Sequence, residues 1–173
     1  LPYKVVGGLR FFDRKEIKDV MAYFRLIYNS SDSVSFKRII NTPARGIGKT
    51  SLDKLDEAWA REGSIWEFLT KEVTAGSIFS GKTHKKFYDF HQMVENWMNV
   101  QPTLLLSELY HQILDHTRYV ESLKAEGTDE ALDRVENLEE FNSVLLEFEE
   151  RELQGLPEEE ALRRKPLLLG KFL

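Results

Sequence analysis

The sequence contains no cysteine, and this absence removes several kinds of chemistry at once. Disulfide bonds, thiolate metal sites and a cysteine nucleophile are all excluded. The longest uncharged apolar runs, such as residues 104–106, are also far shorter than the roughly 20 residues that a membrane-spanning helix needs. The start of the chain has no signal-peptide pattern. We therefore expect a soluble protein of a reducing cytoplasm, with no membrane partner.

Sequence patterns for metal binding and for hydrolysis are missing as well. No i,i+4 ligand pair and no accompanying glutamate motif for zinc occurs among the four histidines, His84, His91, His111 and His116. There is no Gly-x-Ser-x-Gly nucleophile elbow, and neighbouring carboxylates such as Glu139 and Glu140 diverge on a helix. We therefore predict no catalytic residue, no metal site and no cofactor site in this chain.

The composition is that of a folded domain whose charge is unevenly distributed. The 173 residues are 42% hydrophobic and 31% charged, and a chain of this size buries roughly 70% of the surface that its unfolded form exposes. The net charge is -5, but residues 1–54 carry +6 and residues 55–173 carry -11. A surface that faces phosphate is therefore expected in the N-terminal third, because phosphate would repel the remainder.

Hydrophobic residues recur at helical spacing through most of the chain. The spacing predicts helices over about residues 13–28, 34–40, 51–62, 64–71, 83–99, 103–116, 118–126 and 129–153. No run after Val6 alternates with the period of a strand. We therefore predict one irregular, all-α, multi-helix domain over residues 1–173, with about eight helices.

The two ends of the chain indicate a segment of a larger protein. The chain opens without methionine on a strand-like run at residues 1–6, and it stops within a helix-like run at residues 167–173. We expect these ends to add short strand or helix pieces to a neighbouring domain. Residues 147–160 are strongly acidic, which is typical of a solvated helix end and loop, and an interaction surface is the alternative.

Residues 76–83, Gly-Ser-Ile-Phe-Ser-Gly-Lys-Thr, match the Walker A pattern of nucleotide-binding proteins. In a true P-loop the glycines let backbone amides wrap the phosphates, while a lysine, here Lys82, reaches the outer phosphates. A P-loop also follows a buried strand, whereas residues 66–72 have the pattern of a helix. We favour an interhelical loop in which Thr83 caps the next helix, over an independent nucleotide-binding site.

A second glycine-rich segment, residues 45–51, meets several requirements of an anion-binding turn. Gly46 and Gly48 can adopt positive φ and let the backbone approach a ligand, while Ile47 between them can anchor the turn in the core. Thr50 or Ser51 can then cap the helix that follows. The backbone amides at this helix start would point outward, as an anion site requires.

Two basic residues flank this turn and would reinforce such a site. Arg45 precedes the glycines and Lys49 follows them, beside the partial positive charge of the helix N-terminus. A hairpin of this kind can hold a DNA backbone without reading bases, because phosphate contacts position a protein and do not specify a sequence. A simple helix-helix turn without a ligand is the alternative interpretation.

Three segments of the chain carry a family resemblance. Residues 7–19 read Gly-Gly-Leu-Arg-Phe-Phe-Asp-Arg-Lys-Glu-Ile-Lys-Asp, residues 38–48 read Arg-Ile-Ile-Asn-Thr-Pro-Ala-Arg-Gly-Ile-Gly, and residues 134–141 read Arg-Val-Glu-Asn-Leu-Glu-Glu-Phe. Together they closely resemble the UvrD/PcrA/Rep family of superfamily 1A DNA helicases, over residues 1 to about 150. The resemblance implies the helical 2B subdomain, with residues 1–12 and 166–173 as junctions to the 2A RecA-like domain.

The same resemblance implies a parent enzyme with its own chemistry. Such a parent hydrolyses ATP with magnesium, translocates three-prime to five-prime on single-stranded DNA, and unwinds duplexes in repair or replication. Its ATPase machinery would lie outside this chain, so the fragment alone is expected to be no enzyme and to bind no cofactor. The implied partners are the duplex DNA backbone, the adjoining helicase subdomains and repair proteins, in the nucleoid of a bacterial cytoplasm.

By this resemblance 2B swivels between open and closed arrangements, and its Gly-Ile-Gly hairpin touches the duplex in the closed one. The carried-over contact positions are Lys18, Gly46, Ile47, Gly48, Thr50 and Ser51. Charge and spacing add Arg14 and Arg45 to these, with Lys49 from the turn itself. The rival hypothesis is a protein-interaction or autoinhibitory helical module that makes no direct DNA contact.

Overall fold

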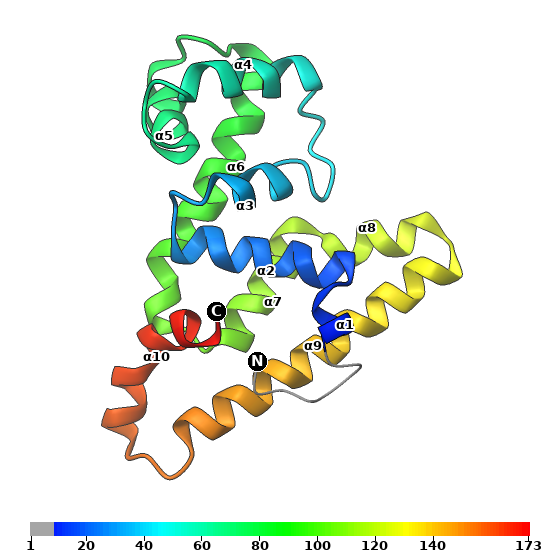
Figure 1. The fold of residues 1–173 in the computed structure, drawn as a ribbon, viewed down its shortest axis with the longest axis vertical. Helices are drawn as coiled ribbons and strands as arrows, with labels where there is room; N and C mark the ends of the chain where they lie inside the picture. The colour runs from blue at the N-terminus through cyan, green and yellow to red at the C-terminus, as the bar shows by residue number, and fades with distance from the viewer. Residues whose placement is uncertain (1–8) are drawn as a thin grey trace. The chain divides into compact units, whose positions relative to one another are not determined.

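The computed structural model describes residues 9–173, and within this range it contains helices and no strand (Figure 1). The elements are α1 (Leu9–Phe12), α2 (Lys15–Tyr28), α3 (Ser33–Ile39), α4 (Lys49–Trp59), α5 (Ile65–Ala75), α6 (Gly81–Val100), the 3-10 turn η1 (Gln101–Thr103), α7 (Leu106–Thr117), α8 (Tyr119–Glu126), α9 (Asp129–Leu153) and α10 (Glu158–Phe172). The predicted all-α fold is therefore confirmed. The strand-like run at residues 1–6 lies outside the described residues. No helix of the described part is long and apolar enough to cross a membrane.

Within residues 9–173 the structure contains two α-helices besides the eight whose bounds were predicted. One is the short α1. The other is α10, which begins after Pro157, contains Pro166 in its interior and includes most of the run at residues 167–173 that was predicted to be helix-like. The acidic segment is therefore the end of α9, a turn, and the first turn of α10. Acidic side chains are favourable in that first turn, because they face the positive end of the helix dipole.

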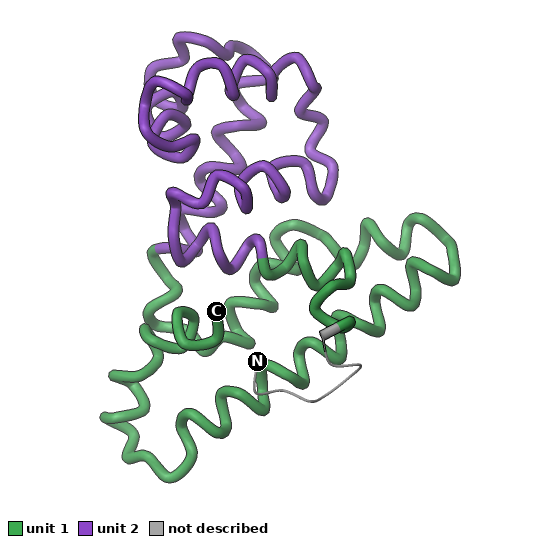
Figure 2. The backbone as a smooth tube through the Cα atoms, viewed as in Figure 1, with its two compact units in different colours: residues 1–21, 99–173 green, residues 22–98 purple. Residues whose placement is uncertain are grey.

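The chain divides into two compact units (Figure 2). Unit 1 comprises Leu1–Met21 and Asn99–Leu173, and unit 2 comprises Ala22–Met98. The boundaries between them fall inside α2 and α6.

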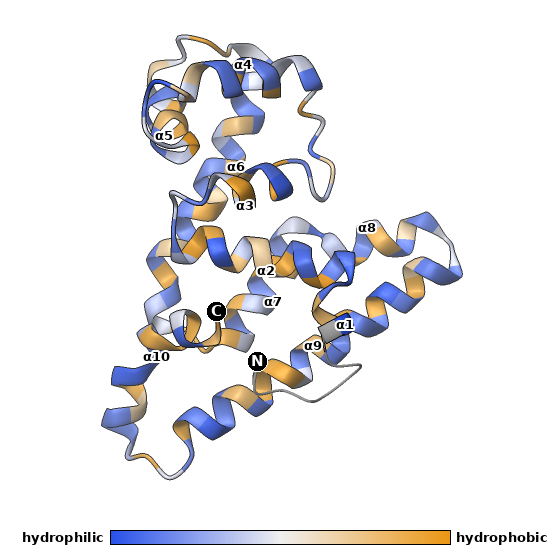
Figure 3. Cartoon of the chain, in the orientation of Figure 1, coloured by the Kyte–Doolittle hydropathy of each residue, from blue (hydrophilic) through white to orange (hydrophobic). Residues whose placement is uncertain are grey.

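Unit 2 has an aromatic core to which distant segments of its sequence contribute. Phe36 of α3 meets Phe90 of α6 edge-to-face, with ring centroids 5.6 Å apart. Tyr23 and Trp97 make a second such pair at 5.7 Å. All four rings are buried, and edge-to-face pairs contribute beyond the area that they bury. In Figure 3 the helices carry alternating apolar and polar bands, as the helical spacing of their sequences predicts.

The core of unit 1 is built around Phe141 of α9. Its ring centroid lies 6.3 Å from that of Phe11, 5.3 Å from that of Tyr110 and 6.1 Å from that of Phe172. The hydroxyl of Tyr110 donates a hydrogen bond to the Leu138 carbonyl oxygen at 2.6 Å. Burial raises the pKa of Tyr110, and the charge of Glu139 adds to this effect. The phenol is therefore a neutral, structural part of the core.

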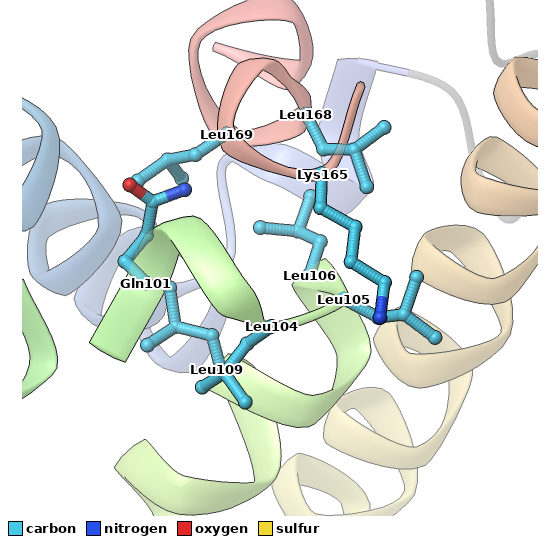
Figure 4. Close-up of a pocket in the computed structure, with 8 residues that line it drawn as sticks. All are labelled: Gln101, Leu104, Leu105, Leu106, Leu109, Lys165, Leu168 and Leu169. Atoms are coloured by element: carbon cyan, nitrogen blue, oxygen red, sulfur yellow. The ribbon is translucent and has the colours of Figure 1, made fainter. Parts of the chain in front are cut away.

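A leucine-rich hollow between η1, α7 and α10 lies in unit 1 (Figure 4). The side chains converge so closely that the space between them cannot hold a water molecule. It is lined by Gln101, Leu104, Leu105, Leu106, Leu109, Lys165, Leu168 and Leu169. This hollow is a packed seam that holds α10 against α7, and it has no room for a ligand.

Candidate nucleic-acid interface

The glycine-rich segment forms the turn between α3 and α4. Gly46 has φ +74°, as predicted, and this left-handed conformation favours glycine. The prediction of positive φ at Gly48 is wrong, because Gly48 has φ -76° and ψ 163°. Gly48 is the N-cap of α4, so the prediction that Thr50 or Ser51 caps this helix is also wrong. The helix begins at Lys49, two residues earlier than predicted, and an extended N-cap needs no left-handed residue.

The turn is closed from inside by Asn41 and Ile47. Ile47 is 3% exposed, which confirms that it anchors the turn in the core. The Asn41 side-chain oxygen accepts hydrogen bonds from the backbone amides of Arg45 at 3.0 Å and Ile47 at 3.3 Å. Its amide nitrogen donates to the Ile47 carbonyl oxygen. One side chain thus satisfies three backbone groups that have no helix or sheet partner.

Arg45 is directed into the protein. Its guanidinium donates to the carbonyl oxygens of Ile39 and Ile40, at the C-terminal end of α3, and to the hydroxyl of Tyr23. The guanidinium carbon also lies 4.8 Å from the centroid of the Phe90 ring, in cation–π geometry. The last carbonyls of a helix have no intrahelical partner, so Arg45 caps α3. Its predicted phosphate contact therefore competes with bonds that hold the turn.

The outward side of the turn presents backbone amides and one exposed cation. The backbone amides of Lys49, Thr50 and Ser51 donate to no acceptor among the described residues. The first amide of α4 with a partner is that of Leu52, which donates to the Gly48 carbonyl oxygen at 3.1 Å. The side chain of Lys49 is 92% exposed and lies 3.8 Å from the Asp53 carboxylate. These free amides add their dipoles to the positive end of α4, which favours an anion there.

Lys86 of α6 also reaches this turn, although it is not among the residues predicted from the sequence. Its Nζ donates to the carbonyl oxygen of Gly46 at 2.8 Å. A methyl group on Gly46 would lie 3.1 Å from the same Nζ. The available signal was the basic stretch at residues 82–86, which stands within the otherwise acidic part of the chain.

The two other predicted contact residues, Arg14 and Lys18, lie in unit 1. Lys18 is exposed on α2. The guanidinium of Arg14 donates to the side-chain oxygen of Asn137 on α9 and lies 5.6 Å from the centroid of the Phe11 ring. Asn137 donates in turn to the buried Glu16 carboxylate at 2.7 Å. Arg14 therefore belongs to a polar network that joins α2 and α9.

The Walker-like segment, residues 76–83, is a loop between two helices, as predicted. Gly76 ends α5 in the left-handed conformation, but α6 begins at Gly81, so Thr83 is not its N-cap. The buried Glu72 carboxylate accepts the amides of Ile78 at 2.7 Å and Phe79 at 3.0 Å. A P-loop would direct such amides at phosphate. In this chain a carboxylate of the protein already occupies them.

The pKa of Glu72 reflects this arrangement. Burial acts to raise the pKa, but hydrogen bonds from the Ile78 amide, the Ser77 hydroxyl and the Phe79 amide outweigh it, with help from His84. The net result is a pKa below the ordinary value of 4.5. The carboxylate is therefore ionised at neutral pH, and it would repel a nucleotide phosphate at this loop.

The surroundings of the histidines do not form a metal site within the described part of the chain. No group of three or more potential ligands for a metal ion occurs within residues 9–173. His91 is the most buried of the four; its ring stacks on Trp66 at 4.4 Å, and its Nε2 lies 2.9 Å from the Thr70 hydroxyl. Burial lowers the pKa of His91, and the charge of Glu95 opposes this shift. His91 is therefore a packed core histidine.

Comparison with known proteins gives a family match across nearly the whole chain. The model of the UvrD-like helicase C-terminal domain matches residues 1–169. The ATP-dependent DNA helicase PcrA of Bacillus subtilis (strain 168) is 45% identical over 151 residues, which are 87% of this chain and 20% of that protein. DNA helicase II of Rickettsia typhi is 38% identical over 149 residues, or 86% of this chain and 22% of that protein. This chain thus spans about a fifth of the length of the curated relatives that it matches.

Proposed function

This chain belongs to the UvrD-like helicase C-terminal domain family, and on that premise we propose that it is the 2B accessory subdomain of an ATP-dependent, three-prime to five-prime DNA helicase. ATP and magnesium would bind to parts of the enzyme outside this chain. The relatives that carry this segment are named as DNA helicases, and the PcrA proteins of Bacillus subtilis and Staphylococcus epidermidis are named as ATP-dependent. The proposed setting is the bacterial cytoplasm, with the adjoining helicase subdomains and repair proteins as partners.

The proposed task of this subdomain is to hold the backbone of duplex DNA. The observation that carries the proposal is the α3–α4 hairpin, in which the amides of Lys49, Thr50 and Ser51 have no acceptor within residues 9–173. A phosphate oxygen would complete these hydrogen bonds and gain from the helix dipole. Such contacts do not involve base edges, so the grip would be independent of sequence.

Within this hairpin the residues have different roles. Gly46 supplies the left-handed conformation of the turn, Gly48 leaves open space on its outer surface, and Lys49 supplies an exposed charge. Ile47 and Arg45 hold the turn from inside. The exposed Lys18 of unit 1 is proposed as a second contact with the DNA backbone, while Arg14 supports α2 through its bond to Asn137.

The experiment is the paired substitution Gly48→Asp and Gly48→Asn. A Cβ at this position meets no atom within 4 Å, and its φ and ψ suit an N-cap. Both side chains should therefore cap α4 and leave stability unchanged or raised by a few tenths of a kcal/mol. They differ in one negative charge, placed where the phosphate would bind.

Binding is measured with the ¹⁵N-labelled chain, titrated with a short DNA duplex at low salt and followed by NMR, which detects weak affinity. We expect the wild type to show the largest shifts at residues 46–52. Gly48→Asn should show smaller shifts, because its cap takes up one of the free amides, and Gly48→Asp should lose them, because it adds a negative charge. Equal binding by all three proteins, or no shifts at the hairpin in the wild type, would refute the DNA contact. The interaction module without DNA contact would then be the better account.

A further inference from the structure

Lys86 occupies a distinctive position at the hairpin. It comes from α6, forty residues beyond the glycine whose carbonyl oxygen it contacts. Its side chain is half-buried, so the stem packs along the protein while the ammonium group stays at the surface. An ammonium group has three N–H donors, and the bond to Gly46 uses one of them. Donors therefore remain for a ligand at the same edge of the turn.

The charge of Lys86 is not neutralised by a neighbouring carboxylate. Among the described residues, no acidic side chain forms an ion pair with its Nζ, whereas the adjacent Lys85 binds both oxygens of Asp89, at 2.8 and 3.1 Å. Lys49, the other cation of the hairpin, lies 3.8 Å from Asp53. Lys86 thus contributes an uncompensated positive charge beside the free amides.

The bond to Gly46 also changes what the hairpin offers to an anion. A carbonyl oxygen is an acceptor, so an uncovered Gly46 carbonyl would repel a phosphate oxygen that approaches the turn. Lys86 covers this carbonyl and replaces its negative dipole with a full positive charge. The hairpin surface then consists of amide donors and ammonium donors.

We propose that Lys86 is a phosphate-binding residue of the hairpin site, so that the duplex-contacting surface is composite and extends from the α3–α4 turn onto α6. This inference rests on the proposed function, because the ligand is the same DNA backbone. It assigns a contact to a residue outside the glycine-rich segment and within the net acidic part of the chain.

The test compares Lys86→Gln with two matched variants. Lys85→Gln makes the same change in net charge on the neighbouring residue, and Lys86→Arg keeps the charge at the site. Duplex affinity of the labelled chain is measured at several salt concentrations. One lost phosphate contact should make the slope of log affinity against log salt shallower by about 0.9.

We expect this change of slope in Lys86→Gln, while Lys85→Gln and Lys86→Arg keep a slope close to that of the wild type. Retained hydrogen-exchange protection of the Arg45 and Ile47 amides, which donate to Asn41, establishes that the turn is still folded in the free variant. Two results overturn the proposal: a wild-type slope in Lys86→Gln, or an equal change in Lys85→Gln. If Gly48→Asp weakens binding in the same assay, such a result removes Lys86 alone and leaves the proposed function in place.

Discussion

The internal position of Arg45 leads to a sharp prediction about Arg45→Lys. Lysine keeps the positive charge but lacks the planar fork that serves two carbonyls and a hydroxyl together. In the structure these acceptors are the oxygens of Ile39, Ile40 and Tyr23. A lysine ammonium group can keep at most part of this set, and the stacking on Phe90 weakens as well.

The size of the effect follows from the bonds that are lost. Hydrogen bonds to a charged group contribute about 1.5–3 kcal/mol each, and the half-exposed position of Arg45 favours the lower end of that range. If two bonds are lost or weakened, the free energy of unfolding should fall by about 2–3 kcal/mol. The midpoint of thermal unfolding should then fall by about 5–10 °C for a chain of this size.

Circular dichroism at increasing temperature measures this change. The control is Arg61→Lys, at an exposed position after α4, where a surface substitution should stay within about 0.5 kcal/mol. A phosphate-binding Arg45 would behave in the opposite way, with normal stability and altered DNA affinity. Unfolding of Arg45→Lys at the wild-type temperature would therefore refute the structural role argued for this residue.

Two further substitutions test the α5–α6 loop and the closure of the hairpin itself. Glu72→Gln should lower the free energy of unfolding by about 2 kcal/mol at neutral pH, because a charged acceptor of three hydrogen bonds is lost. Since the folded pKa of Glu72 lies below 4.5, its stabilisation is present above that pH and is lost as the pH falls through the folded pKa. Urea unfolding at several pH values should show that the unfolding free energies of wild type and Glu72→Gln become equal in acid. A difference between them that does not change with pH would contradict this. Asn41→Ala should lower the free energy of unfolding by about 1–3 kcal/mol. It should also speed amide hydrogen exchange at Arg45 and Ile47, while the amides of α9 keep their protection. Unchanged exchange at the hairpin would show that Asn41 does not close it.

Much of the fold could be predicted because helical periodicity is a local property. The predicted helix at residues 129–153 has the bounds of α9, where Thr128 caps the start through its side chain. The first part of α10 was missed, because proline and an acidic run argue locally against a helix, and only its end at residues 167–173 was predicted to be helix-like. Its buried Leu168, Leu169 and Phe172 hold it against unit 1, and packing of this kind is not visible in a short window of sequence.

At the candidate site, the local sequence predicted the turn but not the direction of individual side chains. Two glycines flanking a hydrophobic residue predicted a turn with Ile47 as its anchor, and that part is confirmed. The direction of Arg45 depends on Tyr23 and Phe90, which are far from it in sequence. Lys86 reaches the turn for the same reason. Local sequence therefore predicted the position of the turn, but tertiary contacts determine which cations face outward.

This redistribution of charge changes what the hairpin can do by itself. Residues 1–54 have a net charge of +6, but Arg14 and Arg45 use their guanidinium groups within the protein, and Lys37 lies 3.0 Å from Asp56. The cations proposed to contact the DNA backbone are Lys18, Lys49 and Lys86, so we expect a salt slope of only about -2 to -3, at about 0.9 for each phosphate. Under the proposed function, a grip this weak would be sequence-independent and readily released. It would suit a surface that acts while another part of the same protein holds the DNA, because tethering raises its effective concentration.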